Sequence, residues 1–285
     1  MRQIRKCAGN SLATGKSGCQ IDFGKIKAII LVAPGTTLGN TFTKGMFEEK
    51  CHADLPDRIY PIKTIVEYAK NGGEPQTSVV GYGGNGVTGI SAQTDTFTLD
   101  KFSEHLAASL TKNMNKRFDA YYLDENNLLI GVNNGTDELG GIPMSTVYPT
   151  VTPHPTSSAK ATMTISCCLE DAQATIENYD YVQLDFNPID ELNGLVRVDL
   201  VGDGPSNYRI VEAMGGYDRT AEFGPAIAEA ATSVLSGATT VSFDADKGSL
   251  SITGIAGGSL ALKSPAVLFE NDIAGIEYNA TIVAH

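Results

Sequence analysis

The chain has 285 residues, 42% of them hydrophobic, and a net charge of −12. Residues 1–150 carry 15 basic and 15 acidic residues, whereas residues 151–285 carry 6 and 18. The length suffices for one large β domain or two smaller ones, and the acidic body argues against a protein that clamps DNA by neutralising its phosphates.

Residues 1–20 are small, polar and basic, and are predicted to form an arm with little structure of its own. The start lacks the apolar segment of a secretory signal, so we expect synthesis in the cytoplasm. No run approaches the roughly 18 apolar residues of a membrane helix, so we expect no membrane partner.

Residues 25–33 (KIKAIILVA) predict a strand. Residues 34–57 contain scattered Gly and Pro with little periodicity and indicate a long loop, of the kind that is functional or ordered against a partner. Residues 58–69 resume β character, and Pro61 favours an edge position because it has no N–H to donate.

The segment from residue 94 to 132 predicts a strand, one helix and a hairpin. Residues 94–99 (TDTFTL) are β-branched and aromatic, as strands prefer. Residues 100–117 are predicted to form an amphipathic helix that Asp100 caps and whose apolar residues recur every four positions. Residues 118–124 and 128–132 are predicted to pair across a tight turn.

The remaining chain predicts further short strands. Strands are expected at residues 142–151 (an edge strand), 160–169, 179–186, 195–201, 207–212, 239–243, 249–254, 259–263, 266–269 and 275–283. Residues 187–194 are rich in turn formers and mark a domain boundary, and residues 225–235 predict a short helix with Pro at its start.

Together these patterns predict a mainly β (α+β) protein, a β-sandwich or barrel with one flanking amphipathic helix and a C-terminal β-rich region. The expected organisation is a basic arm at residues 1–20, a β domain at 21–194 and a β-rich domain at 195–285. The β domain would include the long loop 34–57 and the helix 100–117.

Three glycine-rich or acidic motifs resemble ligand loops but lack what the chemistry needs. Residues 9–17 have glycines spaced one residue too far apart for a phosphate-binding loop and no strand before them. Residues 81–86 match G-x-G-x-x-G, but the β-branched residues 87–91 do not open the helix that a dinucleotide site requires, which favours a hairpin tip. Residues 244–248 lack most ligands of a calcium loop and predict a hairpin turn.

Cysteine and histidine also show no catalytic or metal pattern. The cysteines are Cys7, Cys19, Cys51, Cys167 and Cys168, and the histidines are His52, His105, His154 and His285. There is no Cys-x-x-Cys, and neighbouring strand residues such as Cys167 and Cys168 point to opposite faces. We therefore expect no catalytic, cofactor-binding or metal-binding residues, and we expect that the protein is not an enzyme.

Residues 58 to about 200 resemble a bacteriophage major tail tube protein. The likeness is carried by RIYPIKTIVEYA, the TDTFTL strand, the FSEHLAASLTKNMNKRF helix, the FDAYYLDENNLLIGV hairpin and the later strands up to VQLDFNP. It covers about half of the chain and rests on the order of elements, without a diagnostic motif.

The resemblance implies a virion structural protein of the tail, made in the host cytoplasm and joined into hexameric rings that stack into a hollow tube. Its partners would be other copies, other tail proteins and DNA as a transient, non-specific passenger. It also implies an arm and a loop that reach neighbours, and an immunoglobulin-like C-terminal domain. Asp180, Asp185, Asp190 and Glu191 would line the acidic lumen or a ring junction.

Other classes stay open. A phage head or decoration protein would share the composition and the lack of chemistry, and an adhesin or pilus subunit would need a signal peptide. A carbohydrate-active or nucleotide-binding enzyme would need one of the motifs rejected above.

Overall fold

The structure, a computed structural model, describes residues 5–6, 22–79, 81–133, 135, 138–152, 154–157, 160–254 and 260–279. The chain forms two compact units: unit 1 is Met1–Phe47 with Ile59–Leu192, and unit 2 is Glu48–Arg58 with Asn193–His285. The predicted arm, residues 1–20, lies outside the described residues except for Arg5 and Lys6.

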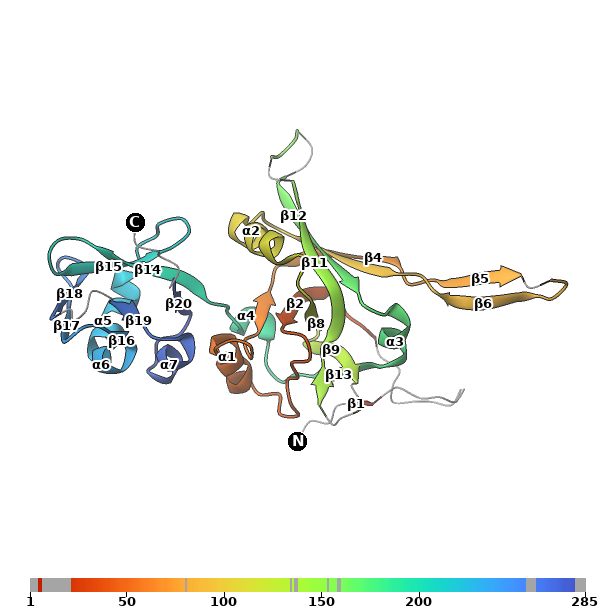
Figure 1. The fold of residues 1–285 in the computed structure, drawn as a ribbon, viewed down its shortest axis with the longest axis horizontal. Coiled ribbons are helices and arrows are strands. Elements are labelled where there is room, and N and C mark those ends of the chain that lie inside the picture. Colours follow the sequence, from red (N-terminus) through yellow and green to blue (C-terminus); the bar gives the residue numbers. More distant parts are fainter. Residues whose placement is uncertain are drawn as a thin grey trace. The chain divides into compact units, whose positions relative to one another are not determined.

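Unit 1 is built on one 11-stranded sheet (Figure 1). Its strands are β1 (Arg5–Lys6), β2 (Ile26–Val32), β3 (Tyr60–Ile62), β4 (Ile65–Gly72), β7 (Gln93–Leu99), β8 (Phe118–Asp124), β9 (Leu128–Asn133), β10 (Leu139–Gly140), β11 (Ile142–Thr152), β12 (Thr162–Leu169) and β13 (Tyr179–Gln183). The main order is β1-β13-β9-β8-β11-β12-β7-β4, with β2 joining β8 to β3 and β10 beside β9. The mainly β prediction is confirmed, and the described strands do not close into a barrel.

Four helices belong wholly or partly to unit 1: α1 (Lys44–His52), α2 (Glu104–Asn113), α3 (Ala172–Glu177) and α4 (Pro188–Glu191). The division between the units runs through α1. The predicted helix 100–117 is α2, which is shorter because Ser103, not Asp100, accepts the first N–H, that of Leu106. Asp100 instead bonds to Lys160 and to the carbonyl of Thr64.

The core of unit 1 comes from the period-two pattern of its strands. In β7, Gln93, Asp95, Phe97 and Leu99 are all buried, whereas the threonines between them are only half-buried. Phe97 meets the ring of Tyr122 on β8 edge-on, with centroids 5.1 Å apart. Helix α2 adds Ala107 and Leu110 to the same core.

Two expectations for unit 1 are wrong. The stretch 34–57 is not loop throughout, because α1 forms within it. Strand β11 is not an edge, because it lies between β8 and β12. Its prolines are tolerated at the centre of the sheet because Pro149 lies where β11 pairs with β12 alone, and Pro143 where it pairs with β8 alone.

The predicted hairpin 118–132 is confirmed, with Tyr122 opposite Ile130 and Leu123 opposite Leu129. The buried carboxylate of Asp124 accepts the N–H groups of Asn126 and Leu128 in the turn. The edge position expected from Pro61 also holds, because β3 pairs with β2 alone among the described strands.

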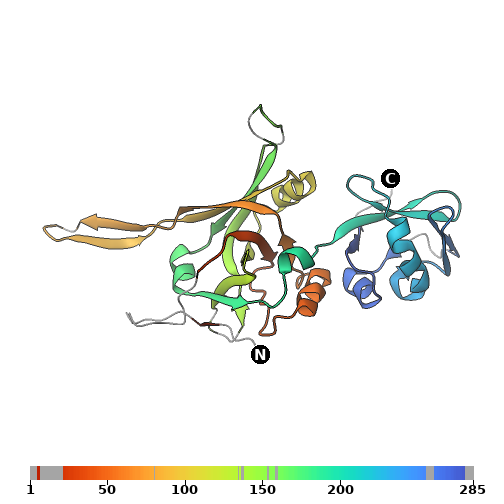
Figure 2. The same cartoon turned by 180° about the vertical axis from the view of Figure 1, so that it is seen from behind.

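Unit 2 contains a five-stranded sheet with helices beside it (Figure 2). The strands, in sheet order, are β17 (Thr240–Asp244), β18 (Ser249–Thr253), β15 (Asn207–Glu212), β14 (Val196–Gly202) and β20 (Ile276–Tyr278). A short pair, β16 (Leu235–Ser236) with β19 (Ala261–Leu262), and the helices α5 (Thr220–Glu229), α6 (Ala231–Val234) and α7 (Pro265–Glu270) complete it. Its core includes Val198, Ile210, Ile227, Leu250 and Leu268.

This arrangement differs from the two packed sheets of the immunoglobulin-like domain that the resemblance implied, since the described strands form one larger sheet, whose β14–β20 pairing is parallel. The strand expected at residues 266–269 is wrong, because α7 begins there with Pro265 in its first turn, a position that suits proline. The helix expected at 225–235 begins earlier, at Thr220, so Pro225 lies inside α5.

Candidate assembly surface

A long β-hairpin extends from the edge of the unit 1 sheet. It consists of β5 (Pro75–Val79) and β6 (Asn85–Ile90), which prolong β4 and β7 beyond the core. Both views of the ribbon show it reaching past the other elements of unit 1 (Figures 1 and 2). Every residue of β5 is exposed, so the hairpin gains little from packing against its own chain.

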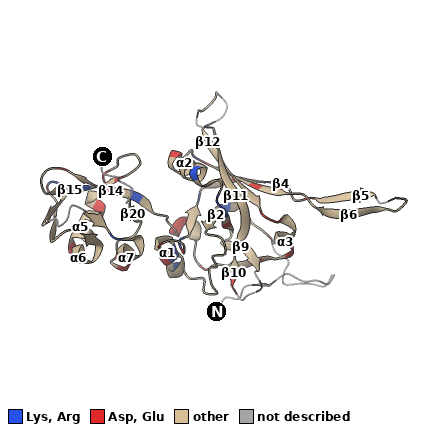
Figure 3. Cartoon of the chain, in the orientation of Figure 1, with Lys and Arg blue, Asp and Glu red and all other residues tan. Residues whose placement is uncertain are grey.

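The hairpin carries no charge. Residues 75–94 contain no Asp, Glu, Lys or Arg, in a chain where 19% of residues are charged. Figure 3 shows the ribbon of β5 and β6 in tan, without the blue or red that marks charged residues. Three large apolar side chains stand free on it: Val79 and Val87 are 64% and 69% exposed, and Tyr82 at the tip is fully exposed.

Such a ribbon is the kind of edge that soluble proteins normally protect. Exposed edge strands present unpaired N–H and C=O groups, and charged residues usually block their pairing with other chains. An isolated two-stranded hairpin is at best marginally stable in water. An uncharged, exposed hairpin with apolar side chains therefore favours contact with another protein surface.

The base of the hairpin is anchored by a buried carboxylate. Asp95 in β7 is fully buried and accepts hydrogen bonds from Tyr122, at 2.8 Å, and from Tyr68 and Gln93, at 3.2 and 2.9 Å. Tyr68 lies on β4 and Gln93 opens β7, so Asp95 holds both strands that lead into the hairpin.

The phenols around Asp95 keep their protons. Burial, reinforced by the charge of Asp95, raises the pKa of Tyr68 and of Tyr122 well above the ordinary value, and the pKa of Tyr179 to about 12. These groups titrate far above neutral pH. Tyr68 and Tyr122 therefore remain hydrogen-bond donors to the carboxylate under physiological conditions.

The glycine motif of residues 81–86 lies at the tip of this hairpin. Residues from Asn85 onward form β6, so a strand follows the glycines, as predicted, and not the helix that a dinucleotide site needs. The turn at residues 244–248 is likewise a hairpin, in which Asp244 accepts the N–H groups of Asp246 and Lys247. The motif at residues 9–17 lies outside the described residues.

The described histidines and cysteines do not form a metal cluster. No group of three or more His, Cys, Asp or Glu that could hold a metal occurs in the described part of the chain. Cys51 and Cys167 are buried and are not part of a disulfide. His52 is buried, and its ring stacks on Phe269 with centroids 4.4 Å apart, a packing role.

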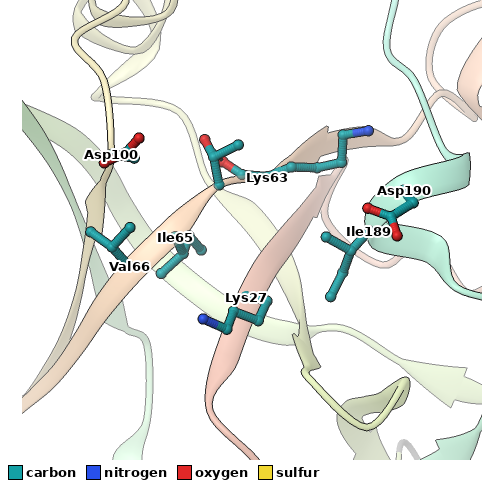
Figure 4. A pocket seen from close by; sticks show the side chains of 8 residues that line it. Lys27, Lys63, Ile65, Val66, Asp100, Ile189 and Asp190 are labelled. Carbon is teal, nitrogen blue, oxygen red and sulfur yellow. Dashed lines mark hydrogen bonds between the residues drawn. The ribbon is translucent and has the colours of Figure 1, made fainter.

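One open hollow of about 500 Å³ lies in unit 1 beside the start of β4 (Figure 4). It is lined by Lys27, Lys63, Thr64, Ile65, Val66, Asp100, Ile189 and Asp190. The ammonium of Lys63 donates to the Leu192 carbonyl, and the Thr64 hydroxyl to the Lys63 carbonyl. The lining holds two lysines and two aspartates, and no His, Cys or Ser.

The acidic residues expected at a lumen do not share one environment. Asp180 is fully buried in β13, where it accepts the N–H of Tyr181, so it cannot line a channel of this fold. Glu191 pairs with Lys44 at 3.0 Å. Asp185 and Asp190 are exposed.

No protein-family model matches this chain, and no curated protein matches it in sequence. None of the described helices is both long and apolar enough to cross a membrane.

Proposed function

We propose that this protein is a non-enzymatic structural subunit that assembles with copies of itself through the hairpin β5–β6. The observation that carries this proposal is the exposed hairpin, which lies within a run of 20 uncharged residues, 75–94. Burying the side chains of Val79, Tyr82 and Val87 in a partner would contribute about 1.5–3 kcal/mol each.

The chemistry of the hairpin selects a protein partner. Nucleic acid is bound mainly by Lys and Arg, which residues 75–94 lack. A second copy fits best because the same unit also offers an open acceptor: the outer edge of β4 is unpaired by any described strand, and Val66 and Tyr68 on it are 55% and 40% exposed. An arm and an edge on one molecule form head-to-tail contacts, which close into rings or continue into tubes.

The assembly we propose is a phage tail tube, in which hexameric rings stack into a conduit for DNA. The subunit would be made in the host cytoplasm and act in the virion tail, with other tail proteins as further partners and no membrane. The order of elements from residue 58 to about 200 and the protruding hairpin support this proposal. The net charge of −12 also suits a lumen that DNA crosses without binding.

A phage head or decoration protein is the second candidate, because a charge-free arm would serve contacts within a shell equally well. An adhesin or pilus subunit is the third. Electron microscopy distinguishes the candidates by product: a hollow tube, a shell or capsomer lattice, or a thin fibre.

The test places charge on the hairpin. In Val79→Lys/Val87→Lys, two valines can no longer be buried, which removes about 3 kcal/mol and raises the critical concentration of assembly by about two orders of magnitude. The matched control is Val201→Lys on β14, where the valine is 47% exposed, and it should assemble like the wild type. Sedimentation velocity and negative-stain microscopy give the readout.

Two results would reject the proposal. A wild-type protein that stays monomeric at millimolar concentration is not a self-assembling subunit of this kind. A hairpin variant that assembles at the wild-type concentration would show that the contact lies elsewhere.

A further inference from the structure

The strand pairing is interrupted where the hairpin leaves the sheet. Pairing of β4 with β7 ends at Gly72 opposite Gln93, and pairing of β5 with β6 resumes at Pro75 opposite Ile90. Two residues on each strand, 73–74 and 91–92, belong to neither ladder. The sheet and the hairpin are therefore two separate hydrogen-bonded elements.

The interruption has the backbone of a pivot. Gly72 and Gly73 both have left-handed φ angles, of 79° and 73°, which residues other than glycine rarely adopt. A Cβ on Gly72 would also lie 2.0 Å from the carbonyl oxygen of Ala92, so this position needs glycine. Two hydrogen bonds join the strands here: the Ser91 N–H to the Glu74 carbonyl at 2.9 Å, and the Glu74 N–H to the Ser91 hydroxyl at 3.1 Å.

The elements on either side of the pivot are firmer. Below it, the carboxylate of Asp95 holds Tyr68 of β4 and Gln93 of β7. Above it, the β5–β6 ladder runs to Val79 opposite Asn85, with one bulge at Thr88, whose hydroxyl donates to the Gln76 carbonyl. Among the described hairpin residues, Ile90 packs against the core of unit 1, and it stands next to the pivot.

We infer that the hairpin is a hinged arm that swings as a unit about Gly72–Gly73 and Ser91–Ala92. The inference rests on the proposed function, because the swing adjusts the angle at which the arm meets a neighbouring copy. The contact of Ile90 with the core sets the resting angle, and binding to a neighbour selects one angle from those that the free subunit samples.

Distances between spin labels measure the swing directly. Labels at Ser78→Cys on β5 and Lys112→Cys on α2, both exposed positions, report the arm against the core. A second pair, Lys112→Cys with Gln173→Cys on α3, reports the core alone. Cys7, Cys19 and Cys168 are replaced by serine, and the buried Cys51 and Cys167 are kept.

In the free subunit, double electron–electron resonance should give the arm pair a distance distribution at least twice as wide as that of the core pair. Ile90→Ser should widen it further because the contact with the core is lost. Gly73→Ala should narrow or shift it, since a Cβ there would lie 2.3 Å from Oε1 of Gln93. Gly84→Ala, at the open tip, should leave it unchanged.

The hinge would be refuted if the distance distribution of the arm pair were as narrow as that of the core pair and did not change in Ile90→Ser and Gly73→Ala. When labelled protein is diluted into unlabelled assemblies, the arm pair should narrow to one distance, and an equally broad distribution there would also count against it. Failure of the proposed function looks different: no assembly forms at all, while the free subunit still shows the broad distribution.

Discussion

Tyr122→Phe tests how much the buried carboxylate at the base of the hairpin depends on its donors. Asp95 is fully buried, and its three donors, Tyr122, Tyr68 and Gln93, are all neutral. Hydrogen bonds to a charged group contribute about 1.5–3 kcal/mol each, and a buried acceptor that loses its donor costs its full desolvation. Tyr122 is 3% exposed and its bond is 2.8 Å long, so water cannot replace the hydroxyl.

We therefore expect Tyr122→Phe to lower the free energy of unfolding of unit 1 by about 2–3 kcal/mol. Tyr121→Phe is the matched control, because Tyr121 is also fully buried but donates to two neutral carbonyls, those of Thr36 and Leu139, at 3.1 and 3.0 Å. Its loss should cost about 1 kcal/mol. Tyr68→Phe should lower the free energy of unfolding by about 1 kcal/mol or less, because Tyr68 is 40% exposed and a water molecule can replace its hydroxyl as the donor to Asp95.

Native-state hydrogen exchange, read by mass spectrometry on peptides from β7 and β8, measures the effect within unit 1. A global melt would mix the two units and does not yield one free energy. If Tyr121→Phe cost as much as Tyr122→Phe, or more, the claim that a charged Asp95 makes its hydrogen bonds unusually strong would be refuted.

Two further predictions concern pH and unit 2. Burial raises the pKa of Tyr121 and Tyr122, and that of Tyr179 to about 12, from an ordinary 10.0, so above pH 10 the folded state holds protons that the unfolded state has lost. The stability of unit 1 should be intact below about pH 10 and then fall by about 1.4 kcal/mol per pH unit for each tyrosine, which lowers the urea midpoint of the unit 1 transition between pH 10 and 11; a constant midpoint for that transition would contradict this. In unit 2, the buried ring nitrogen Nε2 of His52 accepts the N–H of Gly275 at 2.8 Å, so His52→Ala should cost about 2–4 kcal/mol, and unchanged exchange protection in β20 would show that the contact is dispensable.

Local patterns predicted the parts of the fold that depend on local rules. The alternation around Phe97 and the turn after Asp124 fixed strands β7, β8 and β9 because turn chemistry and a period of two act over a few residues. The tip at residues 81–86 was recognised as a hairpin for the same reason, since β-branched residues after the glycines oppose a helix.

Elements that depend on distant partners were missed. Helix α1 has a weakly amphipathic sequence, and it is held by contacts such as that of Phe47 with the ring of Phe186, which is remote in the chain. Strand β11 can lie at the centre of the sheet because each of its prolines pairs with only one neighbouring strand, Pro143 with β8 and Pro149 with β12. No local sequence pattern predicts this pairing. The four-residue apolar run 266–269 fits a strand as well as a helix, and the decisive signal was the preceding Pro265.

The proposed assembly surface does leave a signal in the sequence. The absence of charge over residues 75–94 stands out only when charge is counted along the chain, whereas motif comparison considers the glycines alone. The anchor beneath it was out of reach, because nothing near Asp95 in sequence indicates that Tyr68 and Tyr122 meet its carboxylate.

Neutrality and length of the hairpin together address a problem that any self-assembling acidic protein faces. Copies that each carry a net charge of −12 repel one another, and at 0.15 M salt this repulsion decays over a Debye length of about 8 Å. From Pro75 to Val79 the extended strand β5 covers about 15 Å, roughly two Debye lengths. In the assembly we propose, the tip would therefore meet a neighbour where the field of its own acidic body is largely screened, and it adds no charge of its own. An acidic arm of equal length would itself be repelled by the neighbouring copy at the point of contact. A short neutral arm would hold the two acidic bodies so close that their charges repel without screening. The assembly we propose therefore needs an arm that is both long and neutral.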